Sequence, residues 1–403
     1  MAAKPPSYKW QFKPRFRRNA FGWRSGPAIQ RVKEAVSEIK KAARKDEVLA
    51  AEGAVSFLER VSPALEQVDS SSGAIGTAVN NAIDSLAQII SAAPADTEIR
   101  EAWLERLFDA HANDQMPYIE QLAEHWGALC ASPELASKWA DQLLNISRHV
   151  LNLPQGQYEH FHGTAACLSA LYAAERYDEL VDILSSARFW HHQRWKVKAL
   201  IAQGKKAEAV RYAQSCKDAW SNAREIDALC EEALISSGLA EEAYRQYGLN
   251  ANRANTNLAW FRAVGKKYPH KEPSEILQDL AAHTPGDEGK WFAAAKSAGL
   301  YNEAIALAHR SPCSPQTLTR AARDFAEKRP SFALEAGVAA LRWLVDGYGY
   351  EVTAADVHDA YFATMTAARN CDREQETMNR LCELVSIGDG FLLNVLKSKL
   401  GIS

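Results

Sequence analysis

Apolar residues recur every three or four positions along most of the chain, which is the spacing of one face of an α-helix. In residues 27–39, Ile29, Val32, Ala35, Val36 and Ile39 share one face, and Lys and Arg occupy the other. The same spacing predicts a helix at 46–61, with Asp46 as its N-cap and a break at Pro63, and a third helix that is introduced by 69–80 and runs to about 93, with Asp69 or Ser70 as a cap. Further helices are expected at 96–111, 117–130 and 133–151, each preceded by Pro, Asp or Ser near its start. Ala and Leu are abundant and β-branched runs are few, so the pattern predicts an all-α fold.

The helical pattern also contains a longer repeat. Each unit consists of a helix, a Gly at its end, and a second helix with an acid and an Ala in its first turn. It is clearest at 291–309 and recurs around Gly204 and Gly238. The stretch 168–180 follows the same pattern but has Glu175 at the turn. Gly204 and Gly238 are 34 positions apart, and Gly238 and Gly299 are 61 apart, which leaves room for one degenerate unit between them. A period of this length predicts stacked helix hairpins.

The turn at 299–305, which reads Gly-Leu-Tyr-Asn-Glu-Ala-Ile, resembles the tetratricopeptide repeat superfamily, in which this position commonly reads Gly-x-Tyr-x-Glu-Ala. The resemblance covers about 158–310, without that family's Trp-x-x-Leu-Gly opening or a regular closing Pro. It implies an elongated α-solenoid of stacked antiparallel hairpins that acts as an interaction scaffold. Any antiparallel helical hairpin is the plainer alternative.

Composition divides the chain into a basic start and an acidic remainder. Residues 1–45 hold 13 Lys and Arg against two Glu, a net charge of +11, so with a total of −3 the other 358 residues carry −14. We therefore expect a basic aromatic arm at 1–26, a helical region at 27–155, and a repeat region with C-terminal capping helices at 156–403. The last boundary is placed in the Pro- and Gly-containing stretch 152–156.

The arm interleaves cations with six large aromatic residues between positions 8 and 23. Cations that follow phosphates and rings that stack on bases are typical of nucleic-acid binding. The candidate nucleic-acid contacts are Lys9, Trp10, Lys13, Arg15, Arg17 and Arg18. The alternatives are an arm whose aromatics cover one end of the helical body while its cations pair with acids, and an arm that serves a partner protein or transit.

Within the body, 189–196 combines Trp, His, Arg and Lys, and Trp and Arg are the residue types that most often anchor interfaces. Trp190, Arg194 and Trp195 are the candidate partner-binding residues; for Trp195 a place in the core is at least as well supported. The expected loops that could approach each other carry two pairs of histidines, His160 and His162, and His191 and His192. Imidazoles are good zinc ligands, so a zinc site is a minor hypothesis, although their spacing matches no known motif. The sequence contains no recognisable catalytic or dinucleotide motif, so we expect no enzyme, metal or cofactor.

Seven unpaired-looking Cys at irregular spacing predict reduced thiols and a cytoplasmic protein, and no apolar run is long enough to span a membrane. The N-terminal part, 21–80, also resembles uncharacterised bacterial helical proteins, which implies a bacterial source. The sequence therefore predicts a non-catalytic helical-repeat scaffold that binds a partner protein or peptide. A nucleic-acid-associated protein that uses its basic arm is the alternative.

Overall fold

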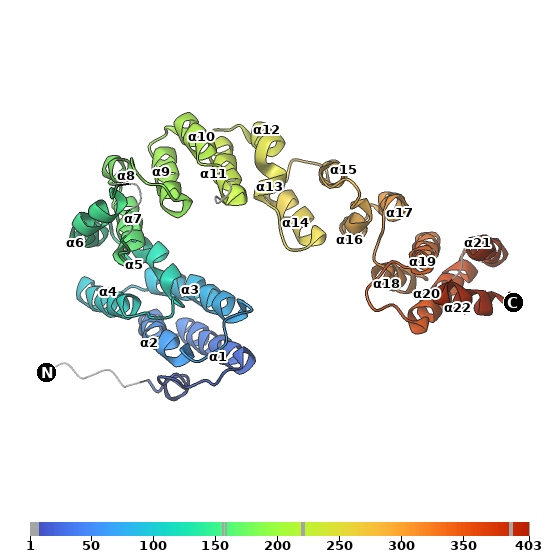
Figure 1. Ribbon diagram of the computed structural model, residues 1–403, viewed down its shortest axis with the longest axis horizontal. Coiled ribbons are helices and arrows are strands. Elements are labelled where there is room, and N and C mark those ends of the chain that lie inside the picture. The colour runs from blue at the N-terminus through green and yellow to red at the C-terminus, as the bar shows by residue number, and fades with distance from the viewer. Residues whose placement is uncertain (1–7, 155–156, 158, 219–221, 387–389, 403) are drawn as a thin grey trace. The chain divides into compact units, whose positions relative to one another are not determined.

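The computed structural model describes residues 8–154, 157, 159–218, 222–386 and 390–402. Over these residues the chain forms helices and no strand, and it divides into two compact units, Met1–Ala233 and Leu234–Ser403 (Figure 1). Within each unit, helices pack mainly against helices one or two positions away in the chain. The expected all-α fold of stacked helices is therefore confirmed, whereas the division at 26 and 155 stays a prediction.

Unit 1 begins with long helices and continues as shorter hairpins. Its helices are the 3₁₀ helix η1 (Lys13–Arg15), α1 (Ser25–Ala43), α2 (Glu47–Leu65), α3 (Ala74–Ala92), α4 (Thr97–Ala112), the 3₁₀ helix η2 (Glu120–His125), α5 (Trp126–Cys130), α6 (Pro133–Leu151), α7 (Gly163–Ala173), α8 (Tyr177–Ile183), α9 (Trp190–Ala202), α10 (Lys206–Ser215) and α11 (Ala223–Ile235, whose last two residues belong to unit 2).

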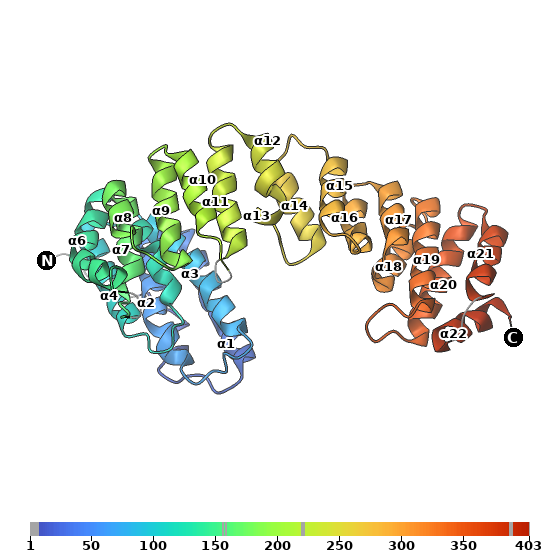
Figure 2. The ribbon, with the colours of Figure 1, turned by 45° about the horizontal axis from the view of Figure 1, so that its top comes forward.

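Unit 2 continues with hairpins around a core that contains the fully buried Trp291 and Tyr268. Figure 2 shows α18, α19 and α20 side by side, in agreement with their contacts. Its elements are α12 (Ala240–Ala243), the π-helix η3 (Tyr244–Gly248), α13 (Leu249–Ala251), α14 (Asn257–Lys267), α15 (Pro273–His283), the 3₁₀ helix η4 (Glu288–Trp291), α16 (Phe292–Ser297), α17 (Tyr301–Arg310), α18 (Pro315–Phe325), α19 (Pro330–Val345), α20 (Ala354–Arg369), α21 (Glu374–Ser386) and α22 (Phe391–Leu400).

The repeated turn has one geometry wherever the sequence pattern marks it. Gly204, Gly238 and Gly299 have φ of 77°, 76° and 77°, the left-handed conformation that glycine adopts without strain. In each turn the following amide donates to the carbonyl five positions back, as Lys205 does to Leu200 at 2.9 Å. These bonds satisfy the last carbonyls of the first helix, which have no partner inside it. The pair α14–α15 occupies the interval between Gly238 and Gly299, where the sequence left room for a degenerate unit.

The residues after each turn explain why the hairpins stack. The acids Glu208, Glu242 and Glu303 lie in the first turn of the second helix, where the positive end of the helix dipole favours them. The Ala that follows each acid is completely buried (Ala209, Ala243 and Ala304). A methyl group is the smallest side chain that still excludes water, so the neighbouring helix packs directly against this position.

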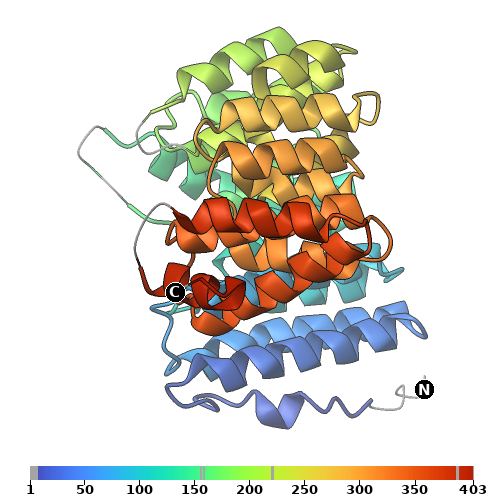
Figure 3. The same ribbon diagram turned by 90° about the vertical axis from the view of Figure 1, so that its right-hand side faces the viewer.

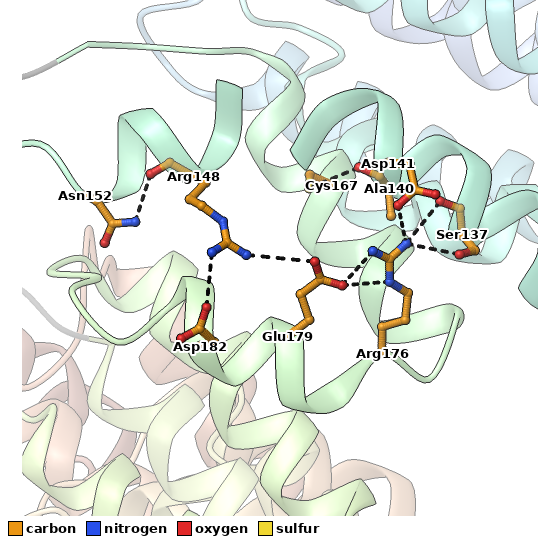
Figure 4. A network of polar contacts seen from close by, with 9 residues as sticks. All are labelled: Ser137, Ala140, Asp141, Arg148, Asn152, Cys167, Arg176, Glu179 and Asp182. Atoms are coloured by element: carbon orange, nitrogen blue, oxygen red, sulfur yellow. Dashed lines mark hydrogen bonds and ion pairs between the residues drawn. The ribbon is translucent and has the colours of Figure 1, made fainter. Parts of the chain in front are cut away.

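In unit 1, two arginines join α6 to α8 (Figure 4). The Arg176 guanidinium donates to Asp141 at 2.6 Å and to Glu179 at 2.8 Å. Arg148 lies between Asp182, at 3.3 Å, and the other Glu179 oxygen, at 3.8 Å. Glu179 is the acid of the repeat pattern in the α7–α8 hairpin. It lies in the first turn of α8 and also binds Arg148 of α6.

The described part of the arm packs along α1 and α2 (Figure 3, dark blue). Trp10, Phe12 and Phe16 are at most 3% exposed, and the last two meet Phe57 of α2 edge to face. Both oxygens of Glu38 accept backbone N–H groups of the arm, from Gln11 at 2.8 Å and Phe12 at 3.2 Å. Trp10, Phe12 and Phe16 are therefore part of the core of unit 1, as expected for an arm whose aromatics cover the helical body.

Three local expectations are wrong. Pro63, expected to interrupt the chain, lies in the last turn of α2. Asp69 does not cap α3, which starts after Gly73; its carboxylate accepts the Ser71 amide at 3.0 Å instead. The helix expected at 117–130 is the 3₁₀ helix η2 followed by the short α5.

Candidate functional site

A cavity of about 580 Å³ opens in unit 1 where loops from several hairpins converge. Its walls come from the end of α4, η2, the loop after α6, the start of α7 and the segment that leads into α9. We call it the histidine pocket, because it is lined by His111, His160, His162, His191 and His192. Its volume lies in the range of about 300–1,000 Å³ that is usual for ligand sites.

The loops that carry these histidines are positioned by the end of α6, by the start of α9 and by a hydrogen bond between the two segments. Helix α6 stops at Leu151, where Pro154 follows shortly, and α9 starts after the extended residue Phe189. The Arg188 guanidinium donates to the Leu153 carbonyl at 3.1 Å, which connects the segment before α9 to the loop after α6. The two histidine pairs of the sequence therefore line one cavity, as the loop hypothesis proposed.

The imidazoles contact one another. The His160 Nε2 lies 3.3 Å from the His162 Nδ1, and the ring centroids of His162 and His111 are 5.9 Å apart. The rings of His191 and His192 are 4.0 Å apart by centroid. Over the residues that the structure describes, no group of three or more His, Cys, Asp or Glu has the arrangement of a metal site, so the zinc hypothesis gains no support from this geometry.

Burial lowers the pKa of three of the imidazoles that line the pocket. It lowers the pKa of His192 to about 3, and the neighbouring His191 and Arg194 add to this effect. Burial also lowers the pKa of His111, against the opposing effect of a hydrogen bond with the backbone of Glu120. For His191 burial is again the largest cause of a lowered pKa, followed by Arg194. At neutral pH these rings line the pocket as uncharged donors and acceptors.

Two buried polar atoms at this wall have no hydrogen-bond partner among the described residues: the His111 Nε2 and the Thr164 Oγ1. Both residues line the pocket and are at most 5% exposed. An unsatisfied buried polar group costs about 1–3 kcal/mol. A bound molecule that offers these two atoms a donor or an acceptor would remove this cost.

Aromatic rings and carboxylates complete the lining. Phe189 is 51% exposed and stacks on His191 at a centroid distance of 5.6 Å, and Phe161 packs over Gly163 at the start of α7. Glu120, Glu124 and Glu159 contribute three carboxylates against the single guanidinium of Arg188. The pocket thus combines apolar faces with an excess of negative charge.

The predicted partner-binding residues lie beside this pocket and face inward. Trp190 is 8% exposed, and its indole N–H donates to Glu225 at 2.8 Å. Arg194 joins Glu124 at 2.5 Å and Glu225 at 2.8 Å, so it connects η2 with α11. Trp195 is 4% exposed in the core. Their neighbours Phe189, His191 and His192 line the cavity instead.

The candidate nucleic-acid contacts divide into two groups. Trp10 is buried, and Arg15 and Arg18 pair with Glu34 at 3.0 Å and Glu66 at 3.4 Å. Lys9, Lys13 and Arg17 form no ion pair with any residue the structure describes. Half of the set is therefore engaged within unit 1.

Sequence reasoning missed His111, Thr164 and Glu120. They lie in or beside ordinary helical segments, and no spacing connects them to the histidine pairs. The only signal was indirect: a histidine on the apolar face of 96–111, where burial without a partner is costly.

Comparison with protein-family models, with curated proteins and with solved structures found no match. The tetratricopeptide resemblance is therefore supported only at the level of an all-helical, hairpin-built fold. Among the described helices, none has the length and apolar character needed to cross a membrane.

Proposed function

We propose that this protein is a non-catalytic helical-repeat scaffold that binds a peptide segment of a partner protein in the histidine pocket. The observation that carries the proposal is the open cavity with two unsatisfied buried polar atoms in its wall, His111 Nε2 and Thr164 Oγ1. A peptide supplies what the wall lacks, because its backbone and side chains offer both donors and acceptors.

The surrounding groups suit a peptide as well. The half-exposed Phe189 presents an aromatic face at the rim, and aromatic side chains at interfaces often contribute most of the binding energy. Trp190 and Arg194 support the pocket from behind, since their bonds to Glu225 fix the start of α9. In this proposal they are positioning residues.

The test is selection of peptides from a random library on the purified full-length chain, with affinities measured by fluorescence polarisation. Phe189→Ala should weaken binding of the selected peptides about tenfold, equivalent to about 1.4 kcal/mol. Phe391→Ala is the matched control, because Phe391 is 71% exposed in the other unit and should have no effect. Failure to enrich any peptide, or equal affinity of Phe189→Ala and wild type, would refute the proposal.

Nucleic-acid binding is the second candidate function. It rests on the unpaired cations Lys9, Lys13 and Arg17 and on Trp23, which is 72% exposed in the same segment. The burial of Trp10 removes one stacking face from this candidate, so peptide binding has the stronger basis.

A further inference from the structure

We infer that the histidine pocket receives a lysine or arginine side chain of the bound peptide. This inference rests on the proposed function and specifies its ligand. It follows from which hydrogen-bonding atoms of the wall are free, from the charge of the lining, and from the aromatic faces at the rim.

Two groups of the lining have acceptor capacity that no described residue uses. The His111 Nε2 has no hydrogen-bond partner among the described residues, and a neutral imidazole keeps one ring nitrogen as an acceptor. The Glu120 carboxylate, which also lines the cavity, accepts no hydrogen bond from a described residue. Ammonium and guanidinium groups have donors and no acceptor, so they match such a wall better than any neutral side chain.

The charge of the lining points the same way. The described lining holds three carboxylates and one guanidinium, and His111, His191 and His192 add no positive charge at neutral pH because burial lowers the pKa of each of them. Arg194, which does not line the cavity, neutralises part of Glu124 and leaves Glu120 unpaired. An anionic ligand would meet this excess of negative charge without a free cation other than Arg188.

The rim offers a second favourable contact for a cation. Phe161 and Phe189 line the cavity, and an ammonium or guanidinium group within about 6 Å of an aromatic centroid is attracted to the ring. The cavity is also larger than one side chain, so the flanking peptide backbone has room beside Thr164, whose unsatisfied hydroxyl can bond it.

The experiment uses blocked seven-residue peptides with a central arginine, lysine, glutamine or glutamate between alanines, titrated into the full-length chain and followed by NMR. The arginine and lysine peptides should bind at least about tenfold more tightly than the glutamine peptide, and the glutamate peptide should bind least. Glu120→Gln should weaken the arginine peptide about tenfold and leave the glutamine peptide unchanged. Glu98→Gln, an exposed carboxylate on α4 of the same unit, is the matched control and should change neither.

The outcomes separate this inference from the proposed function. If library peptides bind and Phe189→Ala weakens them, but they carry no Lys or Arg and ignore Glu120→Gln, the cation inference is overturned while the peptide site stands. If the four peptides bind equally, it is overturned as well. If neither library nor synthetic peptides bind the folded chain, both proposals fail.

Discussion

The residue at the turn of each hairpin determines how much conformational strain that turn carries. Gly204, Gly238 and Gly299 take the left-handed conformation without a Cβ, whereas Glu175 reaches it with φ of 58°. The Glu175 turn keeps the same hydrogen bonds, from Glu175 to Tyr172 at 3.1 Å and from Arg176 to Leu171 at 3.0 Å. For a residue with a Cβ, the left-handed conformation costs about 1–2 kcal/mol. The fold thus imposes a conformation on Glu175 that its own side chain opposes.

Glu175→Gly should therefore raise the free energy of unfolding by about 0.5–1 kcal/mol, since relief of strain exceeds the extra freedom of glycine in the unfolded chain. Gly204→Ala is the opposite test. A Cβ at Gly204 would meet nothing within 4 Å, so its expected cost of about 1 kcal/mol comes from the backbone alone. Urea denaturation followed by circular dichroism measures both, and a destabilised Glu175→Gly would contradict the account.

At the scale of elements, the arm behaves as an additional layer of unit 1. Its buried rings fill the groove over α2, and there Gly53 has a specific role: a Cβ at this position would overlap the Trp10 ring. Glycine inside a helix costs about 1 kcal/mol relative to alanine. The close approach of Trp10 gives a physical reason for this costly choice, and it makes the two residues energetically coupled.

Because Trp10 and Gly53 are coupled, the effect of Gly53→Ala on stability should change sign when the Trp10 ring is removed. In the wild type, Gly53→Ala should destabilise unit 1 by about 1–3 kcal/mol through overpacking, and Trp10→Ala by about 3 kcal/mol. In the Trp10→Ala background, Gly53→Ala should instead stabilise by about 0.5–1 kcal/mol, because only the helix preference remains. Trp23→Ala, at a residue 72% exposed, is the control and should change little. Additive effects of Gly53→Ala and Trp10→Ala would show that the ring does not lie over Gly53.

For the whole molecule, charge and burial determine the response to pH. Burial lowers the pKa of four histidines, His111, His191 and His192 in unit 1 and His309 in unit 2. In the unfolded chain these rings titrate near pH 6.5, so below that pH the unfolded state binds more protons than the folded state. Their contribution to stability is complete above about pH 6.5 and is lost as the pH falls toward the folded pKa.

His192 gives the widest window, from about 6.5 down to its folded pKa of about 3. The melting temperature of the wild type should fall between roughly pH 7 and pH 4, and the His192→Gln variant should lose less over the same interval. NMR titration should find the His192 ring still neutral at about pH 4. Equal losses in wild type and His192→Gln would mean that this ring is not buried as described.

Local interactions made the helices and hairpin turns predictable from the sequence. Periodicity places apolar residues on one face whatever the partner, and a glycine at the end of a helix favours the same turn in any context. This is why α6, the Asp46 and Asp96 caps and the three glycine turns agree with expectation. A proline near the end of a helix is less informative, because α2 continues through Pro63 to Leu65. The Pro63 carbonyl, like others in a last helical turn, has no partner inside the helix, and it accepts the Asn19 amide of the arm at 2.9 Å.

Only the tertiary structure decided which polar and aromatic side chains remain available. Trp190 and Arg194 are of the residue types that often anchor interfaces, yet both already bind Glu225 within the protein. Glu225 lies 35 positions after Trp190 and 31 positions after Arg194. Trp10 is of a residue type that often stacks on bases, yet its ring is buried in the space that Gly53 of α2 leaves for it. The pocket arises in the same way, from His111 at the end of α4 and histidines of two distant loops. A residue type specifies which bonds a side chain can form, whereas the packing of helices remote in sequence determines whether those bonds are already made inside the protein.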